Sequence, residues 1–242
     1  MKTNLVLDHL TAKPGEKISG YMKIINTELE IPVTLICGTQ EGPAVLVTGG
    51  IHNAEYVGIQ AAMELCAELD PSKLCGDVII FPLVNRSGFE HRTMSMVYED
   101  GKNINREFPG NPEGTTTERI CHTFVEKIFP RVDYYMDLHC GDGYEALYPH
   151  VYTLGAAAPD VNRASDAMAR AVNMDFRYPS KNASGGAYNH AGSMGVPGIL
   201  LERGSRSLWS REEVEADKED VRNVLRYLHV LEGEAKVYDG VQ

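Results

Sequence analysis

Three features are scarce in this sequence, and each scarcity excludes a class of protein. Lys and Arg number 23 against 34 Asp and Glu, which gives a formal net charge of −11 and no basic run that could neutralise nucleic-acid phosphates. No stretch approaches the roughly 20 apolar residues of a membrane span, and the first ten residues lack the apolar centre of a signal peptide. The 5 cysteines are odd in number and scattered, which is typical of reduced thiols. We therefore expect a cytoplasmic globular protein that binds neither nucleic acid nor a membrane.

What is present is typical of an enzyme of the α/β class. The 242 residues, 43% of them hydrophobic and 24% charged, are enough for one large domain with a substantial core. Residues 1–43 resemble an antiparallel, β-rich entry segment, and apolar strands then alternate with helical periods, which predicts a mixed, mainly parallel sheet flanked by helices. We expect one catalytic domain over 1–242. The polar region 85–114 has little hydrophobic period and is expected to be a long functional loop.

The expected elements can be placed by residue number. Strands are predicted at 4–10, 18–25, 31–38, 44–48, 77–84, 132–139 and 197–202. Helices are predicted from 56 to about 70, at 117–129, at 160–172 and after Ser210, where Ser210 and Glu213 form a capping box. The glycine-rich segment 184–195 is expected to precede the strand at 197–202.

One stretch, AVLVTGGIHNAE at 44–55, combines a strand, a glycine pair and two potential metal ligands. The apolar run ends at Gly49-Gly50, and a helical period begins after Glu55, so His52 and Glu55 lie where a strand passes into a helix. Open α/β sheets bind ligands at such junctions, and zinc accepts both imidazole nitrogen and carboxylate oxygen. His-x-x-Glu also occurs by chance in polar loops that cap helices, so further ligands are needed to decide.

Further polar groups follow two other apolar strands. His139 ends the strand at 132–139, and Glu202 ends the strand at 197–202. Together with His52 and Glu55, His139 completes the His₂Glu ligand set typical of catalytic zinc. Glu202 is then the carboxylate expected to take a proton from the water at the zinc and to pass it to the leaving amine. Other roles remain open: His139 could bond to the carboxylate two residues before it, and Glu202 could pair with a following arginine.

Four blocks of sequence extend this interpretation. GGIHNAEYVG, DGKNINREFPGNPEG, YYMDLHCGD and VPGILLERG resemble, in order, blocks of the succinylglutamate desuccinylase/aspartoacylase family within the zinc carboxypeptidase-like superfamily. The resemblance spans about 17–228. It implies a zinc-carboxypeptidase-like fold and one Zn²⁺ per chain, held by His52, Glu55 and His139. It also implies that Glu202 is the general acid/base.

The resemblance also implies a substrate-binding pair. Asn105 and Arg106 match the pair that holds a substrate carboxylate, and guanidinium binds carboxylates bidentately. The alternative is that this pair stabilises its loop together with Asp100. Family members often carry an arginine further upstream that polarises the scissile carbonyl. Met94 falls where that arginine is expected, so Arg92 is the catalytic candidate for this role.

The expected activity is hydrolysis of an amide bond in a carboxylate-bearing small molecule or short peptide, as in an N-acyl amino acid deacylase. The alternatives are a metallocarboxypeptidase that acts on peptide C-termini and a catalytically inactive homologue that binds metal or ligand. Many family members continue into a C-terminal β domain that covers the site, which is not expected here. A more open site, or one covered by another subunit of a homo-oligomer, is therefore expected.

Overall fold

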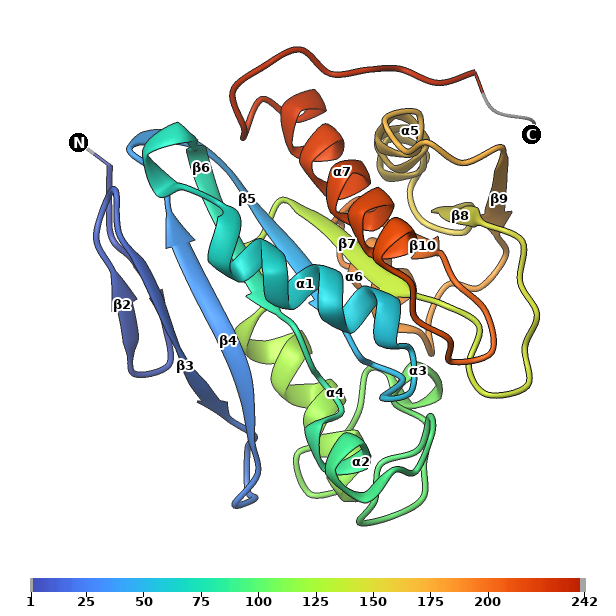
Figure 1. The fold of residues 1–242 in the computed structure, drawn as a ribbon. Coiled ribbons are helices and arrows are strands. Elements are labelled where there is room, and N and C mark those ends of the chain that lie inside the picture. Colours follow the sequence, from blue (N-terminus) through green and yellow to red (C-terminus); the bar gives the residue numbers. More distant parts are fainter. Residues whose placement is uncertain (1, 240–242) are drawn as a thin grey trace.

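A twisted sheet of eight strands forms the centre of the computed structural model, which describes residues 2–239 (Figure 1). In spatial order the strands are β3 (Lys17–Lys23), β4 (Glu30–Cys37), β6 (Cys75–Phe81), β5 (Gln40–Gly49), β7 (Tyr134–His139), β10 (Gly198–Glu202), β8 (His150–Leu154) and β9 (Phe176–Ser180). The four central strands β6, β5, β7 and β10 pair in parallel, whereas β3, β4 and β8 pair antiparallel to their inner neighbours. A small hairpin of β1 (Leu5–Leu7) and β2 (Leu10–Ala12) lies beside β3 and β4. The mixed, mainly parallel α/β sheet is confirmed.

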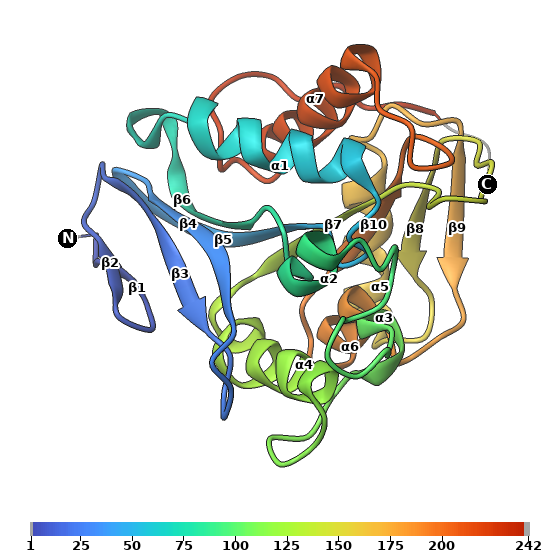
Figure 2. The same cartoon turned by 60° about the horizontal axis from the view of Figure 1, so that its bottom comes forward.

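Helices cover both faces of the sheet. Figure 2 shows α1 (Tyr56–Glu68) and α7 (Arg211–Tyr227) on one face and α4 (Thr116–Lys127) and α6 (Ala187–Ser193) on the other. Helix α5 (Pro159–Ala169) packs on β8 and β10. Because both faces are covered, the central strands are continuous apolar runs, as in β5, where Val45, Leu46 and Val47 are fully buried. No helix in the described range is long and apolar enough to cross a membrane.

Two glycines position the chain after β5. Gly50 has a φ of +65°, a conformation that side chains other than glycine's rarely adopt, and it turns the chain out of the strand toward His52. Gly58, in the first turns of α1, lies so close to β7 that a Cβ atom there would be 2.9 Å from the carbonyl oxygen of Leu138. These two glycines hold the start of α1 against the end of β7, and so bring the ligands of both segments together.

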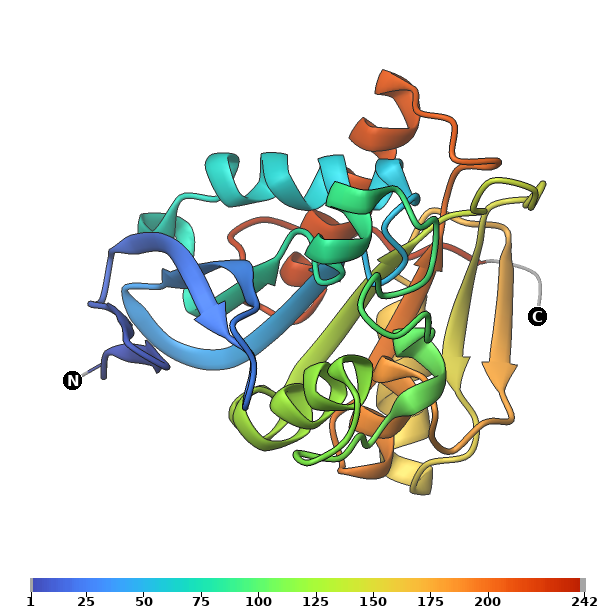
Figure 3. The same ribbon diagram turned by 90° about the horizontal axis from the view of Figure 1, so that it is seen from below.

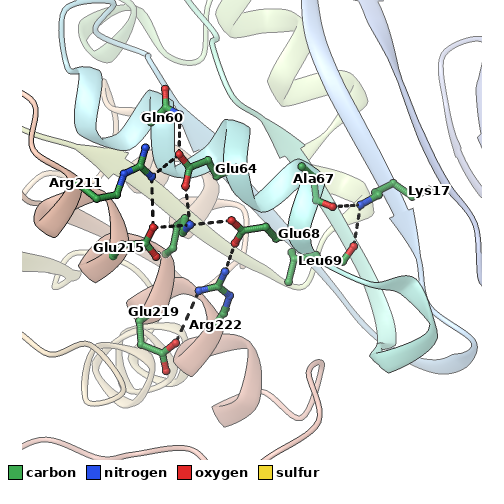
Figure 4. Close-up of polar contacts among 11 residues, drawn as sticks. Lys17, Gln60, Glu64, Ala67, Glu68, Leu69, Arg211, Glu215, Glu219 and Arg222 are labelled. Atoms are coloured by element: carbon green, nitrogen blue, oxygen red, sulfur yellow. Dashed lines mark hydrogen bonds and ion pairs between the residues drawn. The ribbon is translucent and has the colours of Figure 1, made fainter.

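An ion-pair network joins α1 to α7 (Figure 4). The Lys218 ammonium lies 2.6 Å from Glu64, 2.9 Å from Glu68 and 3.0 Å from Glu215, and only 3% of the Lys218 side chain is exposed. Arg211 adds a second contact to Glu64 at 2.6 Å. Hydrogen bonds to Lys218 lower the pKa of Glu64 to about 2, so this carboxylate stays charged. The network ties together the two helices that cover one face of the sheet.

Most predicted elements are present with small shifts at their ends. The antiparallel entry, the strands of the sheet centre and the helices α1, α4, α5 and α7 are confirmed, and Ser210 caps α7 by accepting from the Glu213 amide at 3.2 Å. The expectation of an unstructured loop at 85–114 is wrong at two places, because short helices α2 (Arg86–His91) and α3 (Ile104–Glu107) form there. The segment 184–195 likewise contains α6.

Strands β8 and β9 were not predicted. Strand β9 includes Pro179, which lacks an amide donor and normally argues against a strand. The strand tolerates it because, within residues 2–239, β9 is the edge strand of the sheet and pairs with β8 alone. These two strands add a wall beside the end of β10, which becomes part of the candidate site.

Candidate metal centre and catalytic cleft

Three neighbouring parallel strands deliver the candidate residues to one edge of the sheet. In the pairing of β7 with β10, His139 is the register partner of Glu202, and the chain leaves β5 on the other side of β7 toward His52 and Glu55. The strand ends that carry these residues therefore meet at one edge of the sheet. A cavity of about 590 Å³ opens at this edge, and all four residues line it.

His52, Glu55 and His139 form a compact cluster. Nδ1 of His52 lies 2.8 Å from Oε1 of Glu55, and Nδ1 of His139 lies 2.9 Å from Oε2 of the same carboxylate. The candidate ligand atoms of the three residues all lie within 4.8 Å of one another. Oε2 of Glu55 is buried without a hydrogen-bond partner. A buried carboxylate whose two oxygens are each faced by an imidazole nitrogen fits a bound cation, so these residues can hold a metal ion.

The outer nitrogens of both rings face polar groups. Nε2 of His52 lies 3.1 Å from the amide oxygen of Asn103, and Nε2 of His139 lies 3.2 Å from Oδ2 of Asp137. Oxygens at these positions favour a proton on Nε2, which leaves Nδ1 of each ring with its lone pair for a metal. Asn103 was not singled out from the sequence. Asp137 was considered only as an alternative partner that would make His139 a structural residue, whereas His139 faces Asp137 and Glu55 at the same time.

The charges of the cluster favour a cation. Burial alone would raise the pKa of Glu55, but the neighbouring His139 and His52 lower it to about 2. Burial also opposes a charge on His139, yet the carboxylates of Glu55 and Asp137 raise the pKa of that imidazole well above its ordinary value. In the metal-free protein a proton on His139 therefore neutralises part of the negative charge, and a metal ion would replace it.

Glu202 has the surroundings of a proton-transfer group. Burial, together with the charges of Glu55, Glu145 and Asp137, raises its pKa to about 8, although His139 acts in the opposite direction. Its Oε2 atom is buried without a hydrogen-bond partner. Carboxyl groups with a pKa near neutrality are typical of general acids and bases.

The alternative role of Glu202 as an ion-pair partner finds no support. Arg203 is bound instead by Asp220, at 2.5 Å, and lies 3.4 Å from Asp217. Arg206 is exposed, and within residues 2–239 it makes no ion pair with Glu202. Glu202 therefore lines the cavity and does not pair with either arginine.

Asn105 and Arg106 also line the cavity. The Asn105 side chain is buried; its Oδ1 accepts from the Ala187 amide at 2.8 Å, and its Nδ2 lies 3.3 Å from Nε2 of His139. Arg106 is exposed to the cavity, donates to the carbonyl of Asn105 at 2.7 Å, and has no acidic partner among the described residues. Asp100 is bound to Thr117 instead, so it does not form the loop contact considered as the alternative.

The structure does not bring Arg92 into the cavity. Arg92 is exposed at the C-terminal end of α2, where its φ of +59° ends the helix, and it is not among the residues that line the cavity. Met94 is close by in the chain, and its carbonyl accepts from the amide of Ala54, next to the ligand Glu55. A role for Arg92 in polarising the scissile carbonyl stays a prediction.

Several polar side chains of the cavity were missed, and four of them carry titratable groups. Asp142 and Glu145 lie in the loop after β7, and His150 and Tyr152 lie on β8. Asp142 is the last residue of the block YYMDLHCGD, which could have drawn attention to it, whereas Glu145 and β8 belong to no motif. Tyr188 is 4% exposed and borders the same cavity.

Comparison with known proteins identifies the family. The model of the succinylglutamate desuccinylase/aspartoacylase catalytic domain matches residues 41–228, which is more than half of the chain. The chain belongs to this family. The family resemblance and the zinc-carboxypeptidase-like fold expected from the four sequence blocks are therefore confirmed.

Solved structures of the family have the same fold. A succinylglutamate desuccinylase from Silicibacter sp. TM1040 is 25% identical with a TM-score of 0.88, over 99% of this chain and 75% of that one. The product-bound ectoine utilization protein EutE (DoeB) from Ruegeria pomeroyi is 27% identical with a TM-score of 0.86, over 100% of this chain and 75% of that one.

A family member from Halomonas elongata is named N-alpha-acetyl-L-2,4-diaminobutyric acid deacetylase. It is 42% identical over 113 residues, which is 46% of this chain and 32% of the relative. The match thus spans about a third of that relative's length. Two of these relatives, the desuccinylase from Silicibacter and the deacetylase from Halomonas elongata, carry the names of deacylases.

Proposed function

We propose that this protein is a zinc-dependent hydrolase that removes the acyl group from an N-acyl amino acid. The observation that carries this proposal is the meeting of the His52, Glu55 and His139 cluster with Glu202 in one cavity. Three metal ligands with a separate carboxylate beside them are typical of catalytic rather than structural zinc, which usually has four protein ligands. The deacetylase and desuccinylase names of the relatives support the same reaction class.

Zinc bound by His52, Glu55 and His139 would keep a coordination position open and would make water acidic enough to attack an amide near neutral pH. The protein's own contribution begins with the ligand geometry. Glu55 supplies a charged carboxylate, and the oxygens of Asn103 and Asp137 orient the two imidazole rings.

Glu202 would move the proton of the reaction. Its carboxylate accepts a proton from the attacking water and then passes it to the nitrogen of the leaving amine, so one group acts first as base and then as acid. The burial of Glu202, which raises its pKa above the ordinary value, favours the uptake of a proton from water. Its position opposite His139 in the sheet register keeps it next to the metal ligands.

Arg106 would hold the carboxylate of the substrate. Its guanidinium lines the cavity without an acidic partner in the described part of the chain, so it can form charge-assisted hydrogen bonds with a substrate carboxylate. Asn105, whose amide is fixed between Ala187 and His139, would support the same wall. We propose that this fixed carboxylate positions the amide bond at the metal and beside Glu202.

The test is a hydrolysis screen of the zinc-loaded protein. The substrates are N-acetyl amino acids and dipeptides with a free C-terminus, and the release of primary amine is the signal. We expect turnover of at least one N-acetyl amino acid, and loss of about 10²–10⁴-fold in kcat in the Glu202→Gln variant with zinc content retained. Glu234→Gln, an exposed glutamate in the C-terminal segment, is the matched control and should retain turnover. Cleavage of the dipeptides alone would favour a carboxypeptidase, and zinc binding without any turnover would favour an inactive homologue.

A further inference from the structure

The Glu202 carboxylate is not held by a contact of its own. Within residues 2–239 it makes no hydrogen bond or ion pair, and its Oε2 atom is buried. Such freedom suits a group that first accepts a proton and then releases it. Proton transfer nevertheless requires the carboxylate to lie within hydrogen-bond distance of the water and of the leaving nitrogen. The backbone on either side of Glu202 must therefore set its position.

Glu202 and the next residue, Arg203, point to opposite faces of the sheet. Leu200 belongs to the core cluster that includes the apolar residues of α4, whereas Leu201 belongs to the cluster that includes those of α7. Successive side chains of a strand alternate between faces, so Glu202 lines the cavity and Arg203 faces α7. Figure 3 shows α7, in orange-red, across the sheet from α4, in green. The Arg203 amide donates to the carbonyl of His139 at 3.0 Å, so the pairing of β10 with β7 extends through this residue.

Two segments hold the Arg203 guanidinium on that face. Its Nη2 atom lies 2.5 Å from Oδ2 of Asp220 and donates to the carbonyl of Asn173 at 3.2 Å. The Asn173 amide in turn donates to Oδ1 of Asp220 at 2.8 Å. Nε of Arg203 lies 3.4 Å from Oδ1 of Asp217, whose side chain is fully buried. Because both aspartates are on α7 and Asn173 is in the loop before β9, the guanidinium is anchored to two parts of the fold.

The stability of α7 gives no reason for this charge cluster. Burial raises the pKa of Asp217 well above its ordinary value and also raises that of Asp220, although Arg203 acts in the opposite direction. Buried ion pairs seldom stabilise a fold more than apolar groups of the same size would. The helix is already held by its apolar side and, through Lys218, by α1. The position of the cluster, directly behind the proposed acid/base, points to a different role.

We propose that Arg203 is a positioning residue for Glu202, with Asp217 and Asp220 as its anchors on α7. This inference rests on the proposed deacylase function, which gives Glu202 its part in proton transfer. The Arg203 peptide is joined covalently to Glu202, and its amide is hydrogen-bonded to His139. Holding the Arg203 side chain therefore holds Glu202 at a fixed distance from the metal ligands, while the carboxylate stays free to exchange a proton.

The first test removes the anchor without leaving an unpaired buried charge. Arg203→Met/Asp220→Asn replaces the ion pair as a whole and keeps an acceptor for the Asn173 amide. We expect kcat for an N-acetyl amino acid to fall by about 10²-fold, with KM changed by less than about 2-fold and zinc content retained. Arg203→Lys keeps the cation but not the fork of donors, so its kcat should fall by only about 3–10-fold.

A second comparison distinguishes positioning from a general structural role. In a Glu202→Gln background, Arg203→Met/Asp220→Asn should lower kcat by less than about 3-fold, because the group that Arg203 positions is already absent. Lys218→Met, the matched control, removes another buried cation next to α7 carboxylates and should keep the wild-type kcat. Equal losses in the two backgrounds, or a comparable loss in Lys218→Met, would overturn the inference.

Binding of acetohydroxamate to the zinc-loaded protein gives a readout that needs no turnover. A hydroxamic acid gives its proton to a carboxylate beside the metal as it chelates zinc, and the two groups then share a charge-assisted hydrogen bond. We expect the affinity, measured by calorimetry, to fall by at least about 10-fold in Glu202→Gln and in Arg203→Met/Asp220→Asn. The affinity of Lys218→Met should equal that of the wild type.

The possible results separate the two claims. Turnover by the wild type with an unchanged kcat in Arg203→Met/Asp220→Asn would overturn the positioning role and leave the deacylase function standing. The expected pattern of hydroxamate affinities without hydrolysis of any substrate would support the positioning role and contradict the deacylase. If the double variant does not fold, Arg203→Lys takes its place, and its smaller loss should likewise disappear in the Glu202→Gln background. A loss that persists there would overturn the inference.

Discussion

Oδ2 of Asp137 lies 3.2 Å from Nε2 of His139, on the side of the imidazole ring away from Glu55. The other carboxylate oxygen of Asp137 accepts from the Thr48 hydroxyl at 2.6 Å, and Tyr135 bonds to that hydroxyl at 2.7 Å. This chain of buried groups runs from the core of the sheet to the candidate metal ligand. It holds the Asp137 carboxylate beside the imidazole ring, where the negative charge favours a proton on Nε2.

Replacing Asp137 by Asn should weaken metal binding without abolishing it. The amide keeps the size of the side chain but removes the charge that favours a proton on Nε2 of His139. We expect zinc affinity to fall by about 10–100-fold, measured by competition with a chelator. The control is Thr153→Val, which changes a buried polar side chain of the sheet that does not line the cavity. An unchanged zinc affinity in Asp137→Asn would show that this carboxylate does not support the ligand.

Replacing Arg106 by Ala should raise KM for substrates that carry a free carboxylate. The lost charge-assisted hydrogen bonds are worth about 1.5–3 kcal/mol, so we expect KM to rise by roughly 10–100-fold, with a smaller effect on kcat. The same substrate with its carboxylate capped as an amide should show little difference between the variant and the wild type. Arg163→Ala, at an exposed arginine outside the cavity, is the control. Equal losses on both substrates would argue against carboxylate binding.

The raised pKa of Glu202 has a consequence for stability in the metal-free protein. Its ordinary pKa is 4.5 and its pKa in the fold is about 8, so the folded state binds the proton more tightly than the unfolded state does. The resulting stabilisation is fully present below pH 4.5 and is lost as the pH rises through 8. Glu202→Gln cannot ionise, so it escapes this loss.

The measurement is the free energy of unfolding in urea, for metal-free protein, at pH 5 and pH 8. Relative to wild type, Glu202→Gln should gain about 2–4 kcal/mol of stability on going from pH 5 to pH 8. Glu234→Gln, an exposed glutamate, should show no such gain. The account of Glu202 as a group with a raised pKa fails if the two variants follow the same pH dependence.

Lys218 should matter for stability rather than for chemistry. Lys218→Met would leave Glu64, Glu68 and Glu215 close together without their shared cation. Because these carboxylates are partly exposed, we expect a loss of only about 1–3 kcal/mol, measured by urea unfolding at pH 7. The loss should shrink in high salt, which screens the repulsion among the carboxylates. Lys236→Met, at an exposed lysine, should change stability little.

The sequence predicted those parts of the molecule that depend on local pattern. The central strands are uninterrupted apolar runs because both faces of the sheet are covered. In the helices α1, α4 and α7, the apolar residues recur at the helical period and form the buried side. His52, Glu55, His139 and Glu202 were found because each follows an apolar strand. Their meeting at one edge follows from the parallel pairing of adjacent strands, which places their carboxyl ends together.

The rest of the site could not be predicted because it depends on tertiary packing. Strands β8 and β9 are short, and Pro179 lies within β9, so only their place at the sheet edge makes them strands. The helix α3 is a single turn in a polar segment, and Asn103 faces His52 only because that turn folds back over the cavity. Glu145 belongs to no sequence pattern, and only the fold shows that it lines the cavity.

The metal content of the purified protein tests the central claim most directly. We expect about one zinc per chain in the wild type after zinc is supplied and the excess is removed. His139→Ala, which removes one of three ligands, should lose this zinc under the same conditions, and His122→Ala, at a histidine outside the cavity, should retain it. Stoichiometric zinc in the wild type that disappears only with His139 would confirm the centre. An absence of bound metal in the wild type, or equal zinc in all three proteins, would contradict it.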